Sequence, residues 1–455
     1  MARSDTGQLR RLYNDHAFDT ARDVASYWQA TAPDQAAFPA LSTDKDVDVL
    51  VIGAGFAGLN AALTLARDHD VSAVVLDAGQ PGWAASGRNG GFCGLGSAMA
   101  SKDRLVRQHG KGALEDFVDA QAQAVRYVAH LGDDAGLDLN RVEDGEFCMA
   151  HRPSEMTDLR AMADHYSRLL GQPSDVYEKE SLRQAGIDGP GFHGAVRIPV
   201  GFGLHPLRYV RSLAKAVIAA GASIYGDSPV HSVAQRPDGR FAIETPNCSV
   251  TADRLIIATN GYSSEDVPKW LRGRYLPLVS HIILTEPIPQ DLIAQQGWTT
   301  HQVAFDSRIM LHYFRLLPDG RFLFGMRGPT ELTPTTEAAM QAEIRQHFDH
   351  MFPVWAKIPT AYHWSGLICV TYDMKPYIGP IGDWNNAWLA LGWHGSGVAM
   401  ASYAGKMIAG LSMGKDVSVP EIMTGPLRRF PIPGLRKSYL PFAFRYFDWL
   451  DRRST

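Results

Sequence analysis

Three glycines and one carboxylate near the start of the chain have the types and the spacing needed to bind a dinucleotide. They lie in the turn Gly53-Ala54-Gly55-Phe56-Ala57-Gly58 and at Asp77. Gly53 permits a tight turn, Gly55 lets the backbone approach a pyrophosphate, and Gly58 lets a helix pack closely on a strand. The carboxylate of Asp77 then accepts hydrogen bonds from ribose hydroxyl groups. The pattern therefore predicts a pyrophosphate bound at a helix N-terminus.

The elements around this turn must place it at the carboxyl end of a buried strand. Residues 46–52 end as an apolar, β-branched run, residues 57–69 have helical spacing, and residues 71–76 form a second apolar run before Asp77. A membrane helix over residues 49–66 is the alternative, because these 18 positions carry no charge. Three glycines inside the run and charged residues close to both of its ends favour a strand followed by a helix instead.

Three further glycine-rich segments would wrap the same long ligand. They are Ser86-Gly87-Arg88-Asn89-Gly90-Gly91, Asn260-Gly261 at the end of another expected strand, and Gly392-Trp393-His394-Gly395-Ser396-Gly397 just before an apolar helix that begins at Val398. A helix N-terminus there would stabilise negative charge on the pyrimidine end of a flavin. Each segment alone could be a surface turn, but together they favour FAD over NAD. Further expected cofactor contacts are Phe56, Ala57, Ala78 and Val230.

The rest of the chain predicts two interleaved regions. Residues 114–131, 155–170 and 206–220 have helical patterns, and the phrase Pro-Asp-Gly-Arg-Phe occurs at 237–241 and again at 318–322, in each case as an expected hairpin turn. The expected class is α/β, or α+β overall, with a Rossmann-like FAD-binding domain interleaved with an antiparallel β-sheet substrate domain. The expected boundaries are a helical extension at 1–45, FAD-binding segments at 46–110, 190–265 and 360–420, substrate segments at 111–189 and 266–359, and a tail at 421–455.

The composition is that of a globular protein with little net charge. The chain has 455 residues and a formal net charge of −4, so we expect two domains and no nucleic-acid partner. The four cysteines, Cys93, Cys148, Cys248 and Cys369, are too far apart to predict a metal site or a disulfide framework. The first residues lack the apolar core of a secretion signal and no transmembrane segment is predicted, so we expect a cytoplasmic protein, with a homo-oligomer possible.

Six segments resemble the FAD-dependent amine and amino-acid oxidases of the D-amino-acid oxidase superfamily, most closely its γ-glutamylputrescine oxidase branch. The segments are F-A-G-L-N-A-A-L-T-L-A from Phe56, A-S-G-R-N-G-G-F from Ala85, G-L-H-P-L from Gly203, Y-F-R-L-L-P-D-G-R-F-L-F-G from Tyr313, W-S-G-L-I-C-V-T-Y-D-M-K-P-Y-I-G from Trp364 and G-W-H-G-S-G-V-A-M-A from Gly392. The resemblance covers nearly the whole chain, and the run A-S-G-R-N-G-G is its most specific part.

The resemblance implies a flavoenzyme that oxidises the carbon next to an amine nitrogen, with flavin N5 as the hydride acceptor. The imine product would hydrolyse to an aldehyde, and O2 would be reduced to H2O2. The substrate would be a small-molecule primary or secondary amine of the γ-glutamylputrescine or N-alkyl type. Two alternatives stay open. One is an FAD dehydrogenase for an amino acid or N-methyl amino acid that uses another electron acceptor, and the other is a non-catalytic FAD-binding subunit.

Three positions depart from the superfamily pattern. Gly366 stands seven residues before Asp373, where sarcosine oxidases carry the cysteine that tethers FAD, so the resemblance implies non-covalent FAD. Ile368 stands near the position of an arginine that binds the substrate carboxylate in glycine-oxidase-like relatives. An apolar residue there favours an amine over a small α-amino acid. Leu323 stands where sarcosine oxidases carry a lysine that assists the reaction with O2.

Arg315 is a candidate to replace that lysine. If the hairpin closes on Pro318-Asp319-Gly320, residues 315 and 323 face each other and Tyr313 shares their face. Arg315 would then assist O2, pair with a distal carboxylate of the substrate, or only bind a neighbouring carbonyl group at the sheet edge.

The remaining candidates are aromatic residues and histidines near strand and loop ends. Together with Tyr313 they would form a partly aromatic pocket suited to an amine by cation–π contact. The candidates for catalysis are His394, Arg315 and Tyr313, and those for the substrate pocket are His363, Trp364, Ile368, Trp393 and Leu323. For His394, a hydrogen bond to a neighbouring loop is the alternative role.

The C-terminal run from Tyr439 to Leu450 is unusually aromatic. A helix that lies on a membrane surface is one interpretation. Asp448 and Asp451 weaken that interpretation, and packing on the body of the protein or on a second subunit is favoured.

Overall fold

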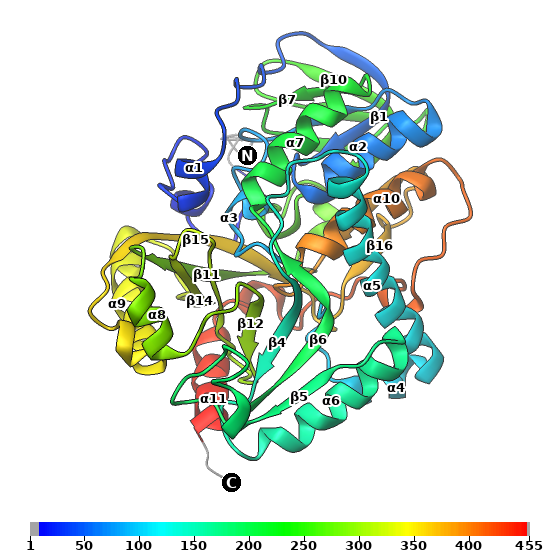
Figure 1. Ribbon diagram of the computed structural model, residues 1–455. Helices are drawn as coiled ribbons and strands as arrows, with labels where there is room; N and C mark the ends of the chain where they lie inside the picture. The colour runs from blue at the N-terminus through cyan, green and yellow to red at the C-terminus, as the bar shows by residue number, and fades with distance from the viewer. Residues whose placement is uncertain (1–8, 453–455) are drawn as a thin grey trace.

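Two β-sheets organise the computed structural model, which describes residues 9–452. Sheet A lies in the upper part of Figure 1 with β1, β10, α2, α7 and α10, and sheet B lies below it with β4, β6, β11, β12 and β14. Residues 1–8 and 453–455 lie outside the described part, and with them most of the stretch on which the expectation about secretion rests. The chain crosses between the sheets several times, so each sheet is built from distant segments.

Sheet A has a parallel core in the order β7-β2-β1-β10-β17, with β16 antiparallel at one edge and the β8-β9 hairpin attached to β10. Its strands are β1 (Lys45–Ile52), β2 (Val74–Leu76), β7 (Ser223–Tyr225), β8 (Ser232–Gln235), β9 (Phe241–Glu244), β10 (Ser249–Ile257), β16 (Tyr377–Pro380) and β17 (Ala387–Leu391). Residues 49–52 of β1 are fully buried because both faces of the strand are covered. The apolar run therefore forms a buried strand and not a membrane helix.

Helices cover one face of sheet A and flank sheet B (Figure 1). They are α1 (Tyr27–Thr31), α2 (Phe56–His69), α3 (Ala85–Arg88), α4 (Lys102–His109), α5 (Lys111–Asp133), α6 (Glu155–Leu170), α7 (Pro206–Ala219), α8 (Gln290–Gln296), α9 (Pro334–Met351), α10 (Val398–Ser412) and α11 (Leu440–Arg452). The helices predicted at 114–131, 155–170 and 206–220 are confirmed as α5, α6 and α7.

A buried chain of polar side chains ties four of these helices together. Asn60 of α2 donates to the hydroxyl group of Tyr209 on α7 at 3.2 Å and accepts from that of Tyr127 on α5 at 2.9 Å. Tyr209 in turn donates to Ser402 on α10 at 2.9 Å. Because buried polar groups must find partners, this chain specifies how the four helices meet.

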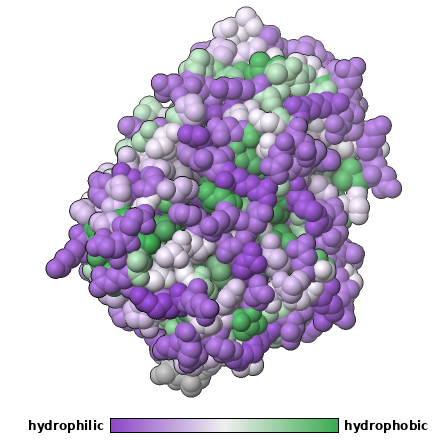
Figure 2. All heavy atoms as spheres, viewed as in Figure 1, coloured by the Kyte–Doolittle hydropathy of each residue, from purple (hydrophilic) through white to green (hydrophobic). Residues whose placement is uncertain are grey.

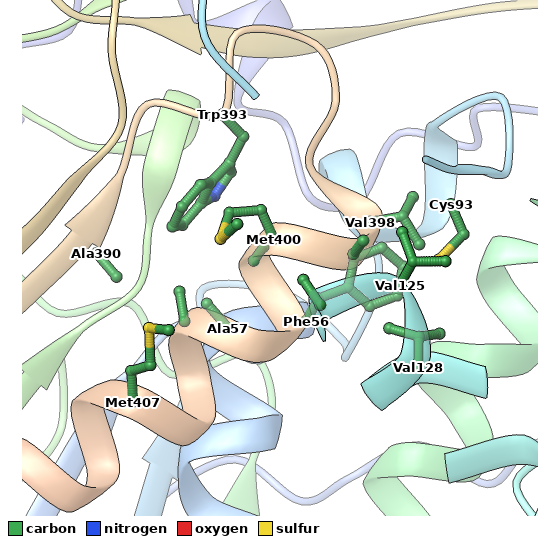
Figure 3. Packing of buried hydrophobic residues seen from close by; sticks show 14 of the residues in the cluster. Phe56, Ala57, Cys93, Val125, Val128, Ala390, Trp393, Val398, Met400 and Met407 are labelled. Atoms are coloured by element: carbon green, nitrogen blue, oxygen red, sulfur yellow. The ribbon is translucent and has the colours of Figure 1, made fainter. Parts of the chain in front are cut away.

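The first turn of α2 is in unusually close contact with the middle of α10. A Cβ atom at Gly405 of α10 would overlap the carbonyl oxygen of Ala57 in α2. Figure 3 shows Phe56 and Ala57 packed among Val398 and Met400 in the same apolar cluster. Gly405 therefore allows the start of α2 to pack closely on the middle of α10.

Sheet B is mixed, in the order β15-β11-β14-β13-β12-β4-β6-β3, with β5 attached to β6. Its strands are β3 (Phe92–Cys93), β4 (Asp144–Met149), β5 (Asp175–Glu178), β6 (Gly194–Gly203), β11 (Leu276–Thr285), β12 (Val303–Asp306), β13 (Tyr313–Leu316), β14 (Phe322–Arg327) and β15 (Thr360–Val370). One face carries an aromatic core shared with α8 and α9. The other face turns toward the glycine-rich loops of the sheet A region.

Both expected hairpins are present, and the second has the expected register. β8 pairs antiparallel with β9, and β13 pairs antiparallel with β14 with Arg315 opposite Leu323. Three strands, β3, β6 and β15, lie in segments expected to form the FAD-binding domain, yet all three belong to sheet B. Their residues are apolar enough for either sheet, and only their long-range partners decide the membership.

The N-terminal and C-terminal segments both pack on this body. The expected helical extension at 1–45 contains only the short helix α1 and one 3₁₀ turn at Asp15–Ala17 within its described part. The face of the molecule in Figure 2 is mostly hydrophilic, with hydrophobic residues in small separate groups. Over residues 9–452, no helix combines the length and the apolar character needed to cross a bilayer.

Candidate functional site

The glycine turn after β1 has the geometry expected of a pyrophosphate cradle. Gly53 has φ of +110°, and a Cβ atom there would lie 2.8 Å from the carbonyl oxygen of Ala258 at the end of β10. A Cβ atom at Gly58 would overlap the carbonyl oxygen of Gly53. Gly55 caps the N-terminus of α2, where N–H groups have no partner within the helix. Gly53 and Gly58 are thus required by close approaches of backbone, and Gly53 also by its φ value.

The same turn is joined to the second glycine-rich loop by Ser86. Its hydroxyl oxygen accepts from the N–H group of Phe56 at 3.0 Å, and a Cβ atom at Gly55 would come within 2.8 Å of it. The two loops therefore meet at the start of α2. An anion at this helix N-terminus would be reached from both loops.

Asp77 follows β2 and closes the other side of the turn. Its carboxylate accepts hydrogen bonds from the N–H groups of Ala54 at 2.5 Å and Gly79 at 3.0 Å, and from the indole N–H of Trp83 at 2.6 Å. Burial raises the pKa of Asp77, while these three donors act against the rise. The carboxylate is thus fixed at the end of the strand, with acceptor capacity that ribose hydroxyl groups can share.

Two tryptophans hold the loop 86–91 from outside. The indole N–H of Trp364 on β15 donates to the carbonyl oxygen of Arg88 at 2.7 Å, and that of Trp28 on α1 donates to the carbonyl oxygen of Asn89 at 2.9 Å. The Asn89 side chain itself accepts from the N–H group of Gly91 at 2.8 Å. The role of Trp28 was not predicted.

The third and fourth glycine-rich segments meet at the carboxyl end of β10. The Asn260 side chain accepts from the N–H group of Gly392 at 3.0 Å, and a Cβ atom at Gly261 would lie 2.8 Å from the carbonyl oxygen of Ile368. Gly397 caps α10, which begins at Val398. These contacts gather β10, β15 and α10 around one edge of sheet A, where ligands bind in α/β folds. Of the other expected cofactor contacts, Ala78 follows Asp77 directly, and Val230 is buried in the core below the sheet.

His394 makes hydrogen bonds to neighbouring segments, as in the alternative role named for it, and its catalytic role stays a prediction. Its Nδ1 atom lies 3.1 Å from the carbonyl oxygen of Ser97, and its Nε2 atom accepts from the N–H group of Thr371 at 3.3 Å. Burial lowers the pKa of His394 to about 4, so the ring is neutral. A proton carrier needs a ring nitrogen that faces the substrate, and both nitrogens of His394 face protein groups.

Tyr313 lies on the face of sheet B that faces the loop 86–91. A Cβ atom built on Gly90 would lie 3.1 Å from the ring of Tyr313. The same ring packs edge-on against Phe92. Its hydroxyl group forms a 2.8 Å hydrogen bond with that of Ser280. Burial raises the pKa of Tyr313 to about 12, so the hydroxyl group keeps its proton at neutral pH.

Arg315 is a buried cation with little compensation. It is 2% exposed, and its Nη2 atom donates to the carbonyl oxygen of Leu204 at 2.7 Å. Its Nε atom has no hydrogen-bond partner, and no carboxylate within residues 9–452 pairs with the guanidinium group. The rings of Trp28 and Phe92 lie 5.5 and 5.9 Å from its Cζ atom. Burying an unpaired charge is costly, so an anion beside Arg315 would be strongly favoured.

Two expected pocket residues lie elsewhere. His363 is on the opposite face of β15 from Trp364, exposed and stacked on His281. Successive side chains of a strand point to opposite faces, so only one of these two neighbours can face the loops. Trp393 is 5% exposed and packs against Met400 inside the core, as Figure 3 shows. His363 thus faces away from Tyr313, and Trp393 belongs to the core cluster around α10.

Three pocket candidates do share the face with Tyr313. Leu323 is fully buried opposite Arg315 and packs with Trp364 in one apolar cluster. Ile368 and Gly366 follow Trp364 at alternate positions of β15, and a Cβ atom at Gly366 would lie 3.6 Å from Arg88. This face is therefore apolar and aromatic except for Arg315 and one carboxyl group.

That carboxyl group belongs to Glu146 on β4, a residue that the sequence did not single out. Its Oε1 atom accepts only a long hydrogen bond, 3.4 Å from the N–H group of Leu95, and a Cβ atom at Gly94 would overlap Oε2. Burial raises the pKa of Glu146 to about 8. The alternation of β4 predicts an inward-facing side chain at this position, but nothing local distinguishes it from a surface glutamate.

The chain is similar to known oxidoreductases over nearly its full length. It is 28% identical over 431 residues to "Probable oxidoreductase OrdL" of Rhizobium meliloti, with 94% of this chain and 97% of the relative covered. It is 25% identical over 432 residues to "Gamma-glutamylputrescine oxidoreductase" of Escherichia coli, with 94% and 98% covered. Glycine oxidase from Geobacillus kaustophilus has the same fold, with a TM-score of 0.68, 18% identity, and 82% of this chain and 96% of that chain covered.

The glycine cradle, Asp77 and the loop 86–91 fit FAD as the group held between the two sheets. The family model for FAD dependent oxidoreductases matches residues 48–411, which include every one of these features. The resemblance seen in the sequence and the expected two-part fold are thereby confirmed. The chain belongs to the FAD dependent oxidoreductase family.

Proposed function

We propose that the protein oxidises the CH–NH bond of a primary or secondary amine, of the γ-glutamylputrescine or N-alkyl type, and reduces O2 to H2O2. Its family makes it an FAD-dependent enzyme that acts on amines or amino acids. In the proposed reaction the amine loses two electrons and two protons to give an imine, which water splits into an aldehyde and an amine or ammonia. O2 accepts the two electrons and the two protons.

The character of the sheet B face carries this proposal. Leu323, Trp364 and Ile368 offer no cation that would bind the carboxylate next to the nitrogen of a small α-amino acid. The ring of Tyr313 and the indole of Trp364 suit the alkyl chain and the nitrogen of an amine. A relative with the printed name gamma-glutamylputrescine oxidoreductase supports the same substrate class.

Each polar group of this face has a distinct task in the proposal. Tyr313, protonated and held by Ser280, positions the substrate nitrogen by a hydrogen bond. Glu146 holds a proton below pH about 8 and can exchange it with the amine. Arg315 pairs with an anion, either a distal carboxylate of the substrate or the negative charge that develops on reduction of O2. Trp28 and Trp364 keep the loop 86–91 in place and exclude water from its outer side.

FAD, when bound, supplies the two-electron acceptor for the C–H bond next to nitrogen. The residues proposed to hold it are the glycine cradle, Asp77, the loop 86–91, Asn260-Gly261 and the N-terminus of α10. We propose that no covalent bond forms, because Gly366 lies beside Arg88 and Tyr262 where a tether would be needed. Acid precipitation should then release intact FAD into the supernatant, and yellow colour that stays with the polypeptide would contradict this.

One observation favours a second candidate function, an FAD dehydrogenase that passes electrons to another acceptor. Leu323 is fully buried and apolar, and Arg315 opposite it donates to Leu204. If the guanidinium group is committed to that contact or to a substrate carboxylate, no cation is left to assist O2. The reaction with O2 would then be slow.

Anaerobic reduction of the bound flavin tests both candidates. We expect loss of absorbance with mono- and diamines, γ-glutamylated amines or N-methyl amino acids, faster as the pH rises toward the pKa of the amine. Glycine and alanine should react poorly. Readmission of air should restore the colour within seconds and produce H2O2. Faster reduction by glycine or common D-amino acids than by every amine would contradict the amine proposal. Slow reoxidation in air would select the dehydrogenase.

A further inference from the structure

The C-terminal helix α11 has two faces of different composition, and the inner face anchors it to sheet B. Leu440 is buried against Leu276 and Val370, and the ring of Phe444 lies 5.0 Å from the Cζ atom of Arg327. These contacts hold the first half of α11 against the ends of β11, β14 and β15. The position of the helix is therefore fixed, and its outer face is a stable surface.

The outer face consists of aromatic and basic side chains. Phe442 is 72% exposed, Tyr446 is 55% exposed and Trp449 is 50% exposed. Steps of four and then three residues put these rings on one side of the helix. Arg445 is exposed between them, and no carboxylate within the described chain pairs with it. Large rings of this kind rarely stay in water without a use.

The two acidic residues of the helix do not interrupt this face. Asp448 pairs with Arg452 of the same helix at 3.0 Å. Asp451 accepts from the N–H groups of Ile309 and Met310 at 2.9 and 3.0 Å, so it faces the protein. The sequence argument against a membrane surface rested on these two residues, and the structure removes it.

The apolar and basic character extends along the chain before the helix. Ile432, Leu435 and Tyr439 are exposed, as is Ile309 beside Asp451. Residues 428–452 contain six basic and two acidic side chains, in a chain whose formal net charge is −4. Four of these basic residues pair with carboxylates, namely Arg428 with Asp373, Arg436 with Glu265, Lys437 with Glu331 and Arg452 with Asp448. Arg429 and Arg445 are exposed and pair with no carboxylate among the described residues, and these two cations complement an anionic surface.

We propose that the outer face of α11 docks on a membrane surface rich in anionic phospholipid. Phe442, Tyr446 and Trp449 would enter the interface between head groups and acyl chains, and Arg445 would lie at the phosphate level. The helix would lie in the plane of the membrane. Because α11 is packed on sheet B, docking also holds that sheet beside the lipid. The proposal goes beyond the amine oxidation and does not depend on the substrate.

Co-sedimentation of the FAD-loaded protein with vesicles tests this directly. We expect binding to vesicles of phosphatidylcholine with phosphatidylglycerol, and much weaker binding to phosphatidylcholine alone or at 0.5 M salt, roughly as charge screening requires. The double substitution Phe442→Ala with Tyr446→Ala should weaken binding at least about tenfold. Arg445→Gln should weaken it about fivefold and only on anionic vesicles, since one basic residue contributes about 1 kcal/mol there.

A matched control is Ile218→Ala, which removes an exposed apolar side chain of α7 far along the chain from α11. This variant should bind vesicles as the natural protein does. FAD content and melting temperature, measured for all variants, verify that each is folded. Equal binding by all variants, or no binding to anionic vesicles, would overturn the proposal.

Sedimentation velocity separates lipid from a second copy of the chain as the occupant. We expect the same sedimentation coefficient for the natural protein and the Phe442→Ala, Tyr446→Ala variant without lipid. An oligomer that this variant dissociates would overturn the proposal and assign the face to a subunit interface.

Discussion

The charged groups on the two sides of the site differ in how many hydrogen bonds they make. On the sheet A side, Asp77 is held by three N–H donors at 2.5 to 3.0 Å. On the sheet B side, Arg315 donates to one carbonyl oxygen at 2.7 Å and Glu146 accepts one long hydrogen bond at 3.4 Å. The first arrangement is complete and rigid, as a ligand of constant shape requires. In the second, Arg315 and Glu146 each have one hydrogen bond and no ion pair in the described part of the chain, which suits groups that bind a ligand or take part in a reaction.

The largest effect should come from a substitution in the cofactor cradle on the sheet A side. In Gly55→Val a side chain would enter the space beside the Ser86 hydroxyl group, where even a Cβ atom comes within 2.8 Å. We expect FAD occupancy below about a tenth of the natural level, because the pyrophosphate must approach this backbone. The ratio of flavin to protein absorbance measures it.

The control for this experiment is Gly112→Val in α5. No heavy atom lies within 4 Å of a Cβ atom at Gly112. Flavin content in this variant should equal that of the natural protein. Full occupancy in Gly55→Val would mean that the turn does not hold the cofactor.

Substitution of Arg315 on the sheet B side should lower turnover without lowering the melting temperature. Arg315→Leu should lower turnover with an amine about 100-fold, as loss of a preorganised charge does. It should also raise or maintain the melting temperature, because a buried cation without a carboxylate partner is replaced by an apolar group. Arg315→Lys, which keeps the charge, should recover part of the turnover.

Arg321→Leu serves as the control for Arg315. It removes a cation of the same hairpin that pairs with Glu286 and Asp319 near the surface. Turnover should change little. If Arg315→Leu instead lowers stability and leaves the turnover of the folded protein unchanged, Arg315 is a structural residue and the comparison of the two sides fails.

Glu146 tests the sheet B side through stability, as a pH dependence of the free energy of unfolding. Its pKa is about 8 in the folded protein against 4.5 for an ordinary glutamate. Between these values the folded protein holds a proton that the unfolded chain has released, so the free energy of unfolding falls as the pH rises. The slope is at most about 1.4 kcal/mol per pH unit. Glu146→Gln should remove this contribution.

Urea unfolding at several pH values from 5 to 9 measures the difference between Glu146→Gln and the natural protein. The advantage of the variant should grow with pH up to about 8 and then level off. Asp144→Asn, at the exposed end of the same strand, is the control and should leave the slope unchanged. A constant difference across the range would place the carboxyl group in contact with water.

The same contrast explains which features could be predicted from sequence. The cradle could, because close backbone approach requires glycine at Gly53, Gly55 and Gly58, and this leaves a local pattern. The register of Arg315 with Leu323 could also be predicted, because a short hairpin turn fixes it. Both depend only on residues close together in the chain.

The rest depends on pairing over long distances. β15 pairs with β11, about eighty residues earlier, and this pairing decides which face His363 and Trp364 occupy. Trp393 was expected to face the substrate because it adjoins a glycine turn, but the close packing of α10 draws it into the core. Glu146 has no local signal, since its burial results from β3 and β6 on one side and the loop at Gly94 on the other.

The contact of Gly405 with Ala57 has a consequence for the order of synthesis. The nucleotide-binding turn leaves the ribosome early, but β10, which pairs with β1, and α10, which packs on the first turn of α2, come from the second half of the chain. Until about residue 412 is made, the turn lacks the packing that orients it. Because α10 completes the packing around this turn, we expect flavin to bind only after nearly the whole polypeptide has been made.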